Sequence, residues 1–340
     1  MRNLLLLLFL SLVSSLPRAE NYAQRNDVQA FVQEMHDRHD FDNNVLTALF
    51  RQTKPIAAVI KAIMPPKDPA VRSWRTYRER FVEPRRIAAG RRFMRTYAAE
   101  LAAAEARFGV PAEIIAAIIG VETLYGKQMG RFGTFAALTT LAFDYPPRAE
   151  LFRKELEELL LLAREEGINP LVYSGSYAGA LGLPQFLPSS RRRFAIDFDH
   201  DGHIDLAASP GDAIGSVGNF LAEHGWERDA PIAVIVTVAG DGTQAMIDEG
   251  ISPRRTQQEM ETTGVSITKK VGAGGTAPEA LIGGTELPDR PAALIDLITP
   301  QAATEYRLGY RNFYVITRYN RSSFYAAAVM DLAAALRDSK

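Results

Sequence analysis

The chain has 340 residues, 47% of them hydrophobic and 23% charged, which is the composition of a globular protein with one or two well-packed domains. Its formal net charge is −1, so no overall positive field attracts nucleic acid. It contains no cysteine, which excludes disulfides, thiol catalysis, thiolate metal sites and a lipid anchor carried by cysteine.

The first residues have the features of an export signal. Arg2 precedes an apolar run over residues 4–13, and the small residue Ala19 follows soon after. This arrangement is typical of a secretory signal. A membrane span needs about 20 apolar residues, and no stretch of the sequence is long and apolar enough for one. We therefore expect a signal peptide over residues 1–19, no membrane span and a soluble exported protein.

Helical patterns dominate the chain as far as residue 230. Apolar spacing predicts two short helices within residues 28–50, with Asp42 or Asn43 capping the second. A charged helical stretch over residues 73–108 is expected to be divided at Pro84. Further helices are expected from Pro111 to Glu122 and over residues 132–141, 150–166 and 212–224. Residues 20–75 thus form an N-terminal helical segment, and residues 76–230 form the main core.

The pattern changes after residue 230. Isoleucine and valine are concentrated in residues 231–238, 265–271 and 293–298, which predicts strands. We expect a small β-rich insertion over residues 231–304 and a C-terminal return to the core over residues 305–340, with a helix at 322–336. The predicted fold class is α+β, mostly α.

Glu122 is the strongest candidate for chemistry. It follows an almost wholly apolar helix whose side chains cover more than one face, which predicts burial most of the way round: Ile114, Ile115, Ile118, Ile119 and Val121. A carboxyl group in apolar surroundings keeps its proton to higher pH, as a general acid requires. The alternative is a surface glutamate on a core helix. A glycine-rich loop over residues 175–190 could let a long polymer approach the backbone.

An acidic loop resembles the start of an EF-hand. Asp197, Asp199 and Asp201 occupy positions 1, 3 and 5, and Gly202 occupies position 6. Position 12 is Ala208 instead of Glu, so Ser209 or Asp212 would have to close the site. The candidate ligands of one structural Ca²⁺ are Asp197, Asp199, Asp201, His203, Asp205 and Asp212. The alternative is an Asx-rich turn without metal, whose carboxylates cap the next helix.

Two further patterns leave alternatives open. Residues 309–320 are rich in Tyr and Asn, which suits either sugar binding or a core strand with tyrosines at alternate positions. Basic pairs and triplets, such as Arg85–Arg86 and Arg191 to Arg193, are expected to be solvated faces, although one of them could contact an anionic polymer.

Five motifs together resemble the lytic murein transglycosylase B family: residues 118–126, 175–190, the Asp197 loop, residues 212–216 and residues 317–320. The resemblance implies a lysozyme-like catalytic core, location in the periplasm and no organic cofactor. It implies that peptidoglycan glycan strands are cleaved between N-acetylmuramic acid and N-acetylglucosamine without hydrolysis, which leaves 1,6-anhydromuramic acid ends. Other cell-wall enzymes are further candidate partners.

The resemblance also assigns roles to residues. Glu122 matches the family's single catalytic acid/base, and Tyr77, Ser176, Gln185, Ser190, Tyr319, Asn320 and Tyr325 match positions expected to bind glycan or support the acid. The sequence departs from the family pattern at Phe220, where a tyrosine is expected, and in the acidic loop, which is one residue longer before Asp212.

Two alternatives to the lyase remain. A lysozyme-type hydrolase would need a second carboxylate, Asp144 or another, to activate water. A calcium-stabilised protein could instead bind peptidoglycan without cleaving it.

Overall fold

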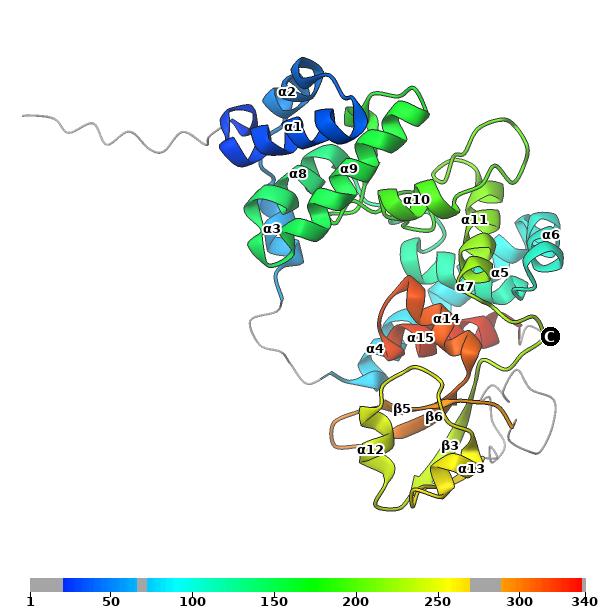
Figure 1. Cartoon of the computed structure of the whole chain (residues 1–340). Coiled ribbons are helices and arrows are strands. Elements are labelled where there is room, and N and C mark those ends of the chain that lie inside the picture. Colours follow the sequence, from blue (N-terminus) through cyan, green and yellow to red (C-terminus); the bar gives the residue numbers. More distant parts are fainter. Residues whose placement is uncertain (1–20, 66–71, 270–288, 338–340) are drawn as a thin grey trace, which may run out of the picture.

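The computed structural model describes residues 21–65, 72–269 and 289–337, and the predicted signal peptide lies outside these ranges. Figure 1 shows three parts stacked along the long axis: an N-terminal helical part, a central helical part and a small sheet. The fold is mostly helical with small antiparallel sheets, as the sequence predicts. Within the described residues, no helix is long and apolar enough to cross a membrane.

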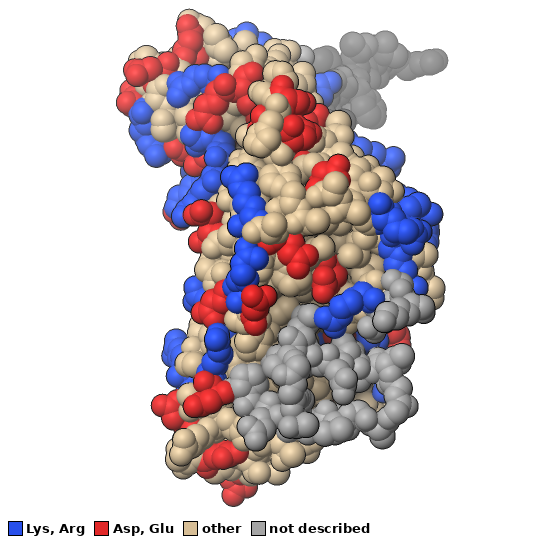
Figure 2. Space-filling model, turned by 90° about the vertical axis from the view of Figure 1, so that its right-hand side faces the viewer, with Lys and Arg blue, Asp and Glu red and all other residues tan. Residues whose placement is uncertain are grey.

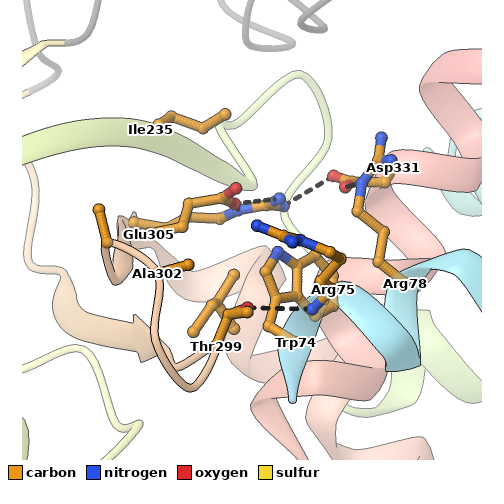
Figure 3. A pocket seen from close by; sticks show the side chains of 11 residues that line it. Trp74, Arg75, Arg78, Ile235, Thr299, Ala302, Glu305 and Asp331 are labelled. Carbon is orange, nitrogen blue, oxygen red and sulfur yellow. Dashed lines mark hydrogen bonds and ion pairs between the residues drawn. The ribbon is translucent and has the colours of Figure 1, made fainter.

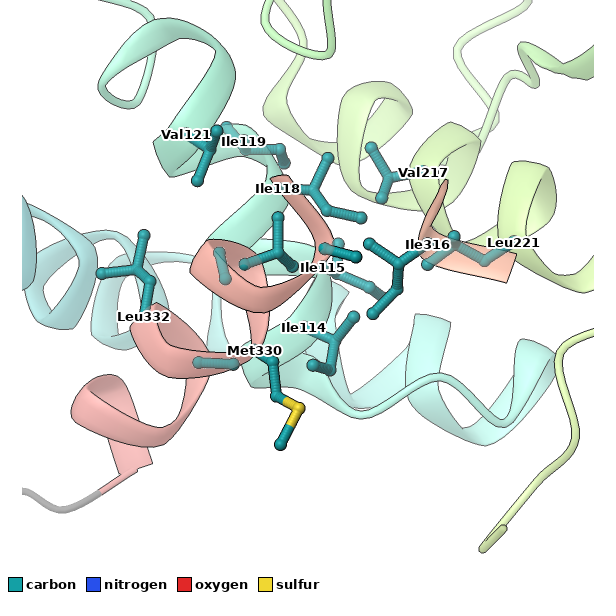
Figure 4. Close-up of a cluster of buried hydrophobic side chains, with 14 of the residues drawn as sticks. Ile114, Ile115, Ile118, Ile119, Val121, Val217, Leu221, Ile316, Met330 and Leu332 are labelled. Carbon is teal, nitrogen blue, oxygen red and sulfur yellow. The ribbon is translucent and has the colours of Figure 1, made fainter. Parts of the chain in front are cut away.

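The central part contains the helix that ends at the candidate glutamate. Its helices are α4 (Trp74–Phe81), α5 (Pro84–Thr96), α6 (Ala98–Phe108), α7 (Ala112–Thr123), α10 (Pro188–Phe194), α11 (Pro210–Glu223), α14 (Arg311–Tyr319) and α15 (Ser323–Arg337). Every residue of α7 from 114 to 121 is buried, so the predicted all-round burial is confirmed. Figure 4 shows its isoleucines among Val217 and Leu221 of α11, Ile316 of α14 and Leu332 of α15.

The helix boundaries follow the sequence signals in part. Pro84 begins α5, as the predicted break requires, but Tyr97 makes a second break, so residues 73–108 form three helices. Gly109 ends α6 in the left-handed region with a φ of 70°. Pro111 precedes α7 as its cap residue and does not lie in the first turn. The first turns of α4 and α10 follow Ser73 and Leu187.

The N-terminal part has a hydrophobic core of its own. It contains η1 (Tyr22–Gln24), α1 (Asn26–His39), α2 (Asn43–Gln52), α3 (Ala57–Ile63), β1 (Phe132–Gly133), α8 (Thr134–Asp144), η2 (Pro146–Arg148), α9 (Ala149–Glu165), η3 (Pro170–Val172) and β2 (Ser174–Gly175). Asp42 caps α2, as predicted. Helices α8 and α9 share this core with α1 to α3. The N-terminal core therefore includes helices that lie beyond the predicted boundary at residue 75.

The sheet part has four antiparallel strands in the order β4-β3-β6-β5. They are β3 (Ala233–Ala239), β4 (Ser266–Lys269), β5 (Ala293–Leu297) and β6 (Glu305–Gly309). The three strands predicted from isoleucine and valine are present, but β6 lies beyond the expected end of the insertion at residue 304. Two short helices, α12 (Thr243–Asp248) and α13 (Gln257–Glu261), were not predicted.

The Tyr- and Asn-rich segment is the clearest difference from the sequence expectation. The core-strand interpretation of residues 309–320 is wrong, because residues 311–319 form helix α14. Phe313, Ile316 and Thr317 are buried, and this spacing is helical although the residue types favour strands. The helix leaves Tyr319 at its C-terminal end.

Charges on the surface are mixed. On the face drawn in Figure 2, basic and acidic side chains are interspersed along the length of the molecule, and neither sign dominates that face.

Candidate active site

Glu122 lies one residue before the end of the buried helix α7. Its side chain is only partly exposed. The phenol of Tyr325, in the first turn of α15, donates a hydrogen bond of 2.7 Å to Glu122 Oε1. Glu122 is therefore not the surface glutamate of the alternative interpretation.

Burial dominates the electrostatics of this carboxyl group. It raises the pKa of Glu122 from its ordinary value of 4.5 to about 7, while the hydrogen bond from Tyr325 acts in the opposite direction. Neither cause is a charged neighbour. A carboxyl group with a pKa near 7 can both give and take a proton at neutral pH.

Three tyrosines from three helices surround Glu122. Tyr325 is 2% exposed and its ring stacks on that of Tyr319, with centroids 6.3 Å apart. Tyr319 also donates a 2.6 Å hydrogen bond to the carbonyl oxygen of Pro184. Burial and the negative charge of Glu122 raise the pKa of Tyr77, on α4, to about 12. The structure thus brings Tyr77, Tyr319 and Tyr325 together with Glu122.

A pocket of about 460 Å³ extends along α4 beside Tyr77. Its described lining consists of Ser73, Thr76, Tyr77 and Arg80. Three hydroxyl groups and a guanidinium group therefore line a space beside Tyr77.

The glycine-rich loop is attached to the end of α7. The hydroxyl of Thr123 lies 3.0 Å from the carbonyl oxygen of Leu183, and its donation there fixes the loop next to Glu122. Gly182 has a φ of 67°, and a Cβ there would lie 2.4 Å from the carbonyl oxygen of Leu206. Only glycine fits this close approach of the loop to the acidic segment.

The remaining predicted glycan residues lie around this loop with different local roles. Ser176 Oγ accepts hydrogen bonds from the amides of Ala178 and Ala180, at 3.3 and 3.1 Å. The Gln185 amide donates to the carbonyl oxygens of Gly182 and Met129, at 2.8 and 3.2 Å. Ser190 is half-buried on α10, and Asn320 is exposed just after α14. No hydrogen bond among the described residues joins Ser190 or Asn320 to Glu122.

Phe220 packs against Tyr319. It is 5% exposed, and its ring centroid lies 4.8 Å from that of Tyr319 and 4.1 Å from that of His224. At this position the side chain supports Tyr319 by packing.

Asp144, the second carboxylate of the hydrolase alternative, lies elsewhere. It is the last residue of α8 in the N-terminal part. There its carboxylate accepts hydrogen bonds from the phenol of Tyr22 and the guanidinium of Arg25. Both oxygens are therefore engaged away from Glu122.

The acidic loop gathers three of its six predicted ligands. Single carboxylate oxygens of Asp197, Asp199 and Asp212 all lie within 4.8 Å of one another. Asp212 also accepts hydrogen bonds of 2.8 Å from the amides of Phe198 and Asp205, which fold the loop around it.

The other three candidates are arranged differently. Asp205 accepts hydrogen bonds from the amides of Ala207 and Ala208, and Asp201 accepts one from the amide of His203. Those bonds, like the ones that Asp197 and Asp199 accept from the amide of Asp201, resemble the Asx-turn alternative. Asp201, His203 and Asp205 lie outside the group of three oxygens.

Sequence reasoning missed the support behind Glu122. The end of α7 is held by Thr123, Tyr125 and Arg86. Their contacts reach distant parts of the chain or depend on unusual backbone angles, so the local sequence gives little sign of them. The one local hint is Gly120, whose missing side chain makes room for the Tyr125 ring.

Known proteins share this fold. The family model Transglycosylase SLT domain matches residues 23–334. Membrane-bound lytic murein transglycosylase B of Escherichia coli K12 is 37% identical over 325 residues, which cover 93% of this chain and 84% of that protein.

Two solved structures have the same architecture. Soluble lytic transglycosylase SltB1 of Pseudomonas aeruginosa is 41% identical with a TM-score of 0.80, over 91% of this chain and 98% of that one. Escherichia coli lytic transglycosylase Slt35 in complex with calcium is 35% identical with a TM-score of 0.76, over 93% and 94%. The chain therefore belongs to the family of lytic murein transglycosylases, which are enzymes of the lyase class.

Proposed function

We propose that this lytic transglycosylase cleaves the β-1,4 bond between N-acetylmuramic acid and N-acetylglucosamine with Glu122 as its single general acid/base. The observation that carries the proposal is the largely buried Glu122 carboxyl, with a pKa of about 7, a phenol as its hydrogen-bond partner and no charged group among the causes of its shift.

The reaction needs one carboxyl group in two protonation states. Protonated Glu122 donates its proton to the glycosidic oxygen as the bond from that oxygen to C1 of the muramyl residue breaks. The acetamido group of that residue stabilises the positive charge at C1. Ionised Glu122 then takes the proton of the C6 hydroxyl while the C6 oxygen bonds to C1. The intramolecular hydroxyl has a high effective molarity, so no activated water is needed.

The tyrosines around Glu122 provide a binding surface for a sugar chain. Aromatic rings stack on sugar rings, and the partly exposed Tyr77 and Tyr319 lie near the carboxyl of Glu122. The buried Tyr325 supports the acid through its hydrogen bond. We assign Ser176, Gln185, Ser190 and Asn320 to glycan binding around them. The hydroxyl-lined pocket beside Tyr77 supports a glycan path along α4.

The acidic loop fits one structural calcium ion. Carboxylate oxygens are the ligands that Ca²⁺ prefers, and three like charges gathered within 4.8 Å repel one another unless a cation offsets them. Asp197, Asp199 and Asp212 would hold the ion, with Asp201, His203 and Asp205 completing the loop. A relative solved with calcium supports this assignment. Removal of calcium by a chelator should lower the Tm, and added Ca²⁺ should restore it; a Tm that does not respond rules out a tight structural site.

We also propose export to the periplasm, where murein lies. The apolar N-terminal run supports export, because it has the features of a secretory signal. The location of murein outside the cytoplasm agrees with export. N-terminal sequencing of the protein secreted by cells should begin at Glu20 if residues 1–19 are removed.

Product analysis tests the reaction. Purified murein sacculi would be digested with the wild type and with Glu122→Gln, and the products identified by mass spectrometry. Anhydromuropeptides from the wild type alone support the proposal. Reducing muramic acid ends would instead indicate hydrolysis, and the absence of products from both proteins would favour a protein that only binds murein.

A further inference from the structure

Arg86 is a buried basic residue that the proposed reaction does not use. Its neighbour Arg85 is exposed, as expected for a basic pair on a solvated face, but Arg86 is only 9% exposed. Among the described residues Arg86 forms no ion pair, although the charge of Glu83 acts on its guanidinium. Its guanidinium lies over the Phe81 ring, 5.2 Å from the centroid.

The hydrogen bonds of Arg86 join two helices of the active site. Its Nε donates to the carbonyl oxygen of Gly120, at 3.0 Å, and its Nη1 donates to the carbonyl oxygen of Arg80. Gly120 precedes Glu122 by two residues on α7, and Arg80 follows Tyr77 by three residues on α4. One planar group therefore spans the backbones that carry the acid and one of its tyrosines.

The position of Arg86 suits a helix end. The last carbonyl groups of a helix lack partners within it, and a cation there also interacts favourably with the helix dipole. The Gly120 oxygen accepts from the Leu124 amide at 3.1 Å, and Arg86 adds a second donor at the same oxygen. Because the guanidinium fork is rigid, its two bonds fix a direction as well as a distance.

The turn that follows Glu122 needs such support. Leu124, Tyr125 and Gly126 all have positive φ, at 50°, 56° and 85°. Two non-glycine residues in succession in the left-handed region persist only where surrounding contacts hold them.

The ring of Tyr125 provides part of that hold. It folds back between α5 and α7, where a Cβ at Gly90 or Gly120 would lie 2.2 or 2.4 Å from its phenol oxygen. The Tyr125 ring and Arg86 thus form one layer directly behind the end of α7.

We propose that Arg86 is a positioning residue, which holds the Glu122 helix and the Tyr77 helix in the register that the reaction needs without touching the glycan. The proposal rests on the proposed role of Glu122. Stability alone does not account for Arg86, because burial of its guanidinium is costly and Glu83, whose charge offsets part of this cost, forms no ion pair with it. An apolar side chain of similar size would avoid that cost.

Arg86→Lys tests the proposal, since it keeps the charge but cannot reach both carbonyl oxygens in the fork geometry. The matched control is Arg91→Lys on the same helix, because Arg91 Nη2 also donates to a helix carbonyl, that of Ala335, at 3.0 Å, away from Glu122. Both variants would be measured for kcat and KM on soluble murein glycan oligomers, for the pH profile of kcat/KM and for Tm.

We expect Arg86→Lys to lower kcat at least tenfold with KM within about twofold, and to move the upper pH limb of kcat/KM, because the Glu122 carboxyl is displaced relative to Tyr77 and Tyr325. Arg91→Lys should leave both parameters within about twofold. Equal kcat losses in the two variants, or an unchanged pH limb, would overturn the proposal.

A second variant covers the case in which Arg86→Lys does not fold. Arg86→Gln is uncharged and can donate to only one carbonyl, so it should show the same loss of kcat, and activity equal to that of the control would again overturn the proposal. The wild type separates this test from that of the reaction: if the wild type makes no anhydromuramic ends, the proposed role of Glu122 fails, whatever the variants do.

Discussion

Two acidic side chains on the buried helices of the central part have opposite surroundings. Glu122 of α7 receives a hydrogen bond from the phenol of Tyr325, and no cation is among the causes of its pKa shift. Asp331 of α15 is paired with two guanidinium groups, that of Arg78 at 2.6 Å and that of Arg307 at 2.9 Å. Burial of Glu122 favours its protonated form, which is the form that a general acid needs.

The ion pairs around Asp331 join the sheet to the central helices. Arg307 on β6 is 1% exposed and also pairs with Glu305 at 2.6 Å, and its guanidinium lies 5.4 Å from the Trp74 ring centroid. Figure 3 shows these charged groups beside Trp74 and Thr299, in a pocket of about 340 Å³. The comparison indicates that paired charges stabilise the fold here, whereas the unpaired acid has the surroundings that the proposed reaction requires.

The largest expected effect is a loss of activity on substitution of Glu122. Glu122→Gln should lower kcat by at least about 10³-fold, because an amide cannot transfer the proton in either step. Its circular dichroism spectrum should match that of the wild type, since the amide can still accept the hydrogen bond from Tyr325. A variant with more than a tenth of wild-type kcat would show that another group is the acid.

The next effect concerns stability. Arg307→Met should lower the free energy of unfolding by about 3 kcal/mol, because it leaves Glu305 without its cation and removes one partner of the buried Asp331. Urea unfolding of this variant would be compared with that of Arg290→Met. Arg290 pairs with Glu227 at the surface, with the two side chains 53% and 49% exposed, so this control should lose less than about 1 kcal/mol. Equal losses would remove the distinction between buried and exposed pairs.

The unpaired acid should also carry a stability cost that depends on pH. The pKa of Glu122 is about 7 in the folded protein and has the ordinary value of 4.5 in the unfolded chain. The folded state therefore binds the proton more tightly, so this group makes the protein progressively less stable as pH rises from about 4.5 to 7, and the loss is complete above 7. The difference corresponds to an upper bound of roughly 3 kcal/mol, and partial exposure reduces it.

Glu122→Gln should therefore raise Tm at pH 8 but leave it almost unchanged at pH 4. Thermal unfolding of both proteins across this range measures the difference. An increase in Tm that is the same at both pH values would show that ionisation of Glu122 is not its cause.

The buried helix of the acid could be predicted because its signal is local. Isoleucines that cover more than one helix face require burial, and the structure confirms it for residues 114–121. Helix α14 was missed because tyrosine, valine and isoleucine favour strands, and only the spacing of Phe313 and Ile316 records the helix.

Contacts between distant residues could not be derived from spacing. Tyr325 is separated from Glu122 by 203 positions, and only the family resemblance pointed to it. Arg86 shows the converse: in the sequence it looks like half of a solvated basic pair, but its direction into the core depends on how α5 packs against α7. The fold class was therefore accessible from the sequence, whereas the supports behind the acid were not.

The smallest expected effect concerns the hydrogen bond that distinguishes Glu122 from Asp331. Tyr325→Phe removes a donor that stabilises the ionised carboxylate, so the pKa of Glu122 should rise further and the upper pH limb of kcat/KM should move to higher pH, by up to about one unit. Tyr319→Phe is the matched control, because the Tyr319 phenol is bonded to the Pro184 carbonyl oxygen and should leave the limb in place. If both variants moved the limb equally, general desolvation by the tyrosine rings would set the pKa of the acid, and the individual bond would not.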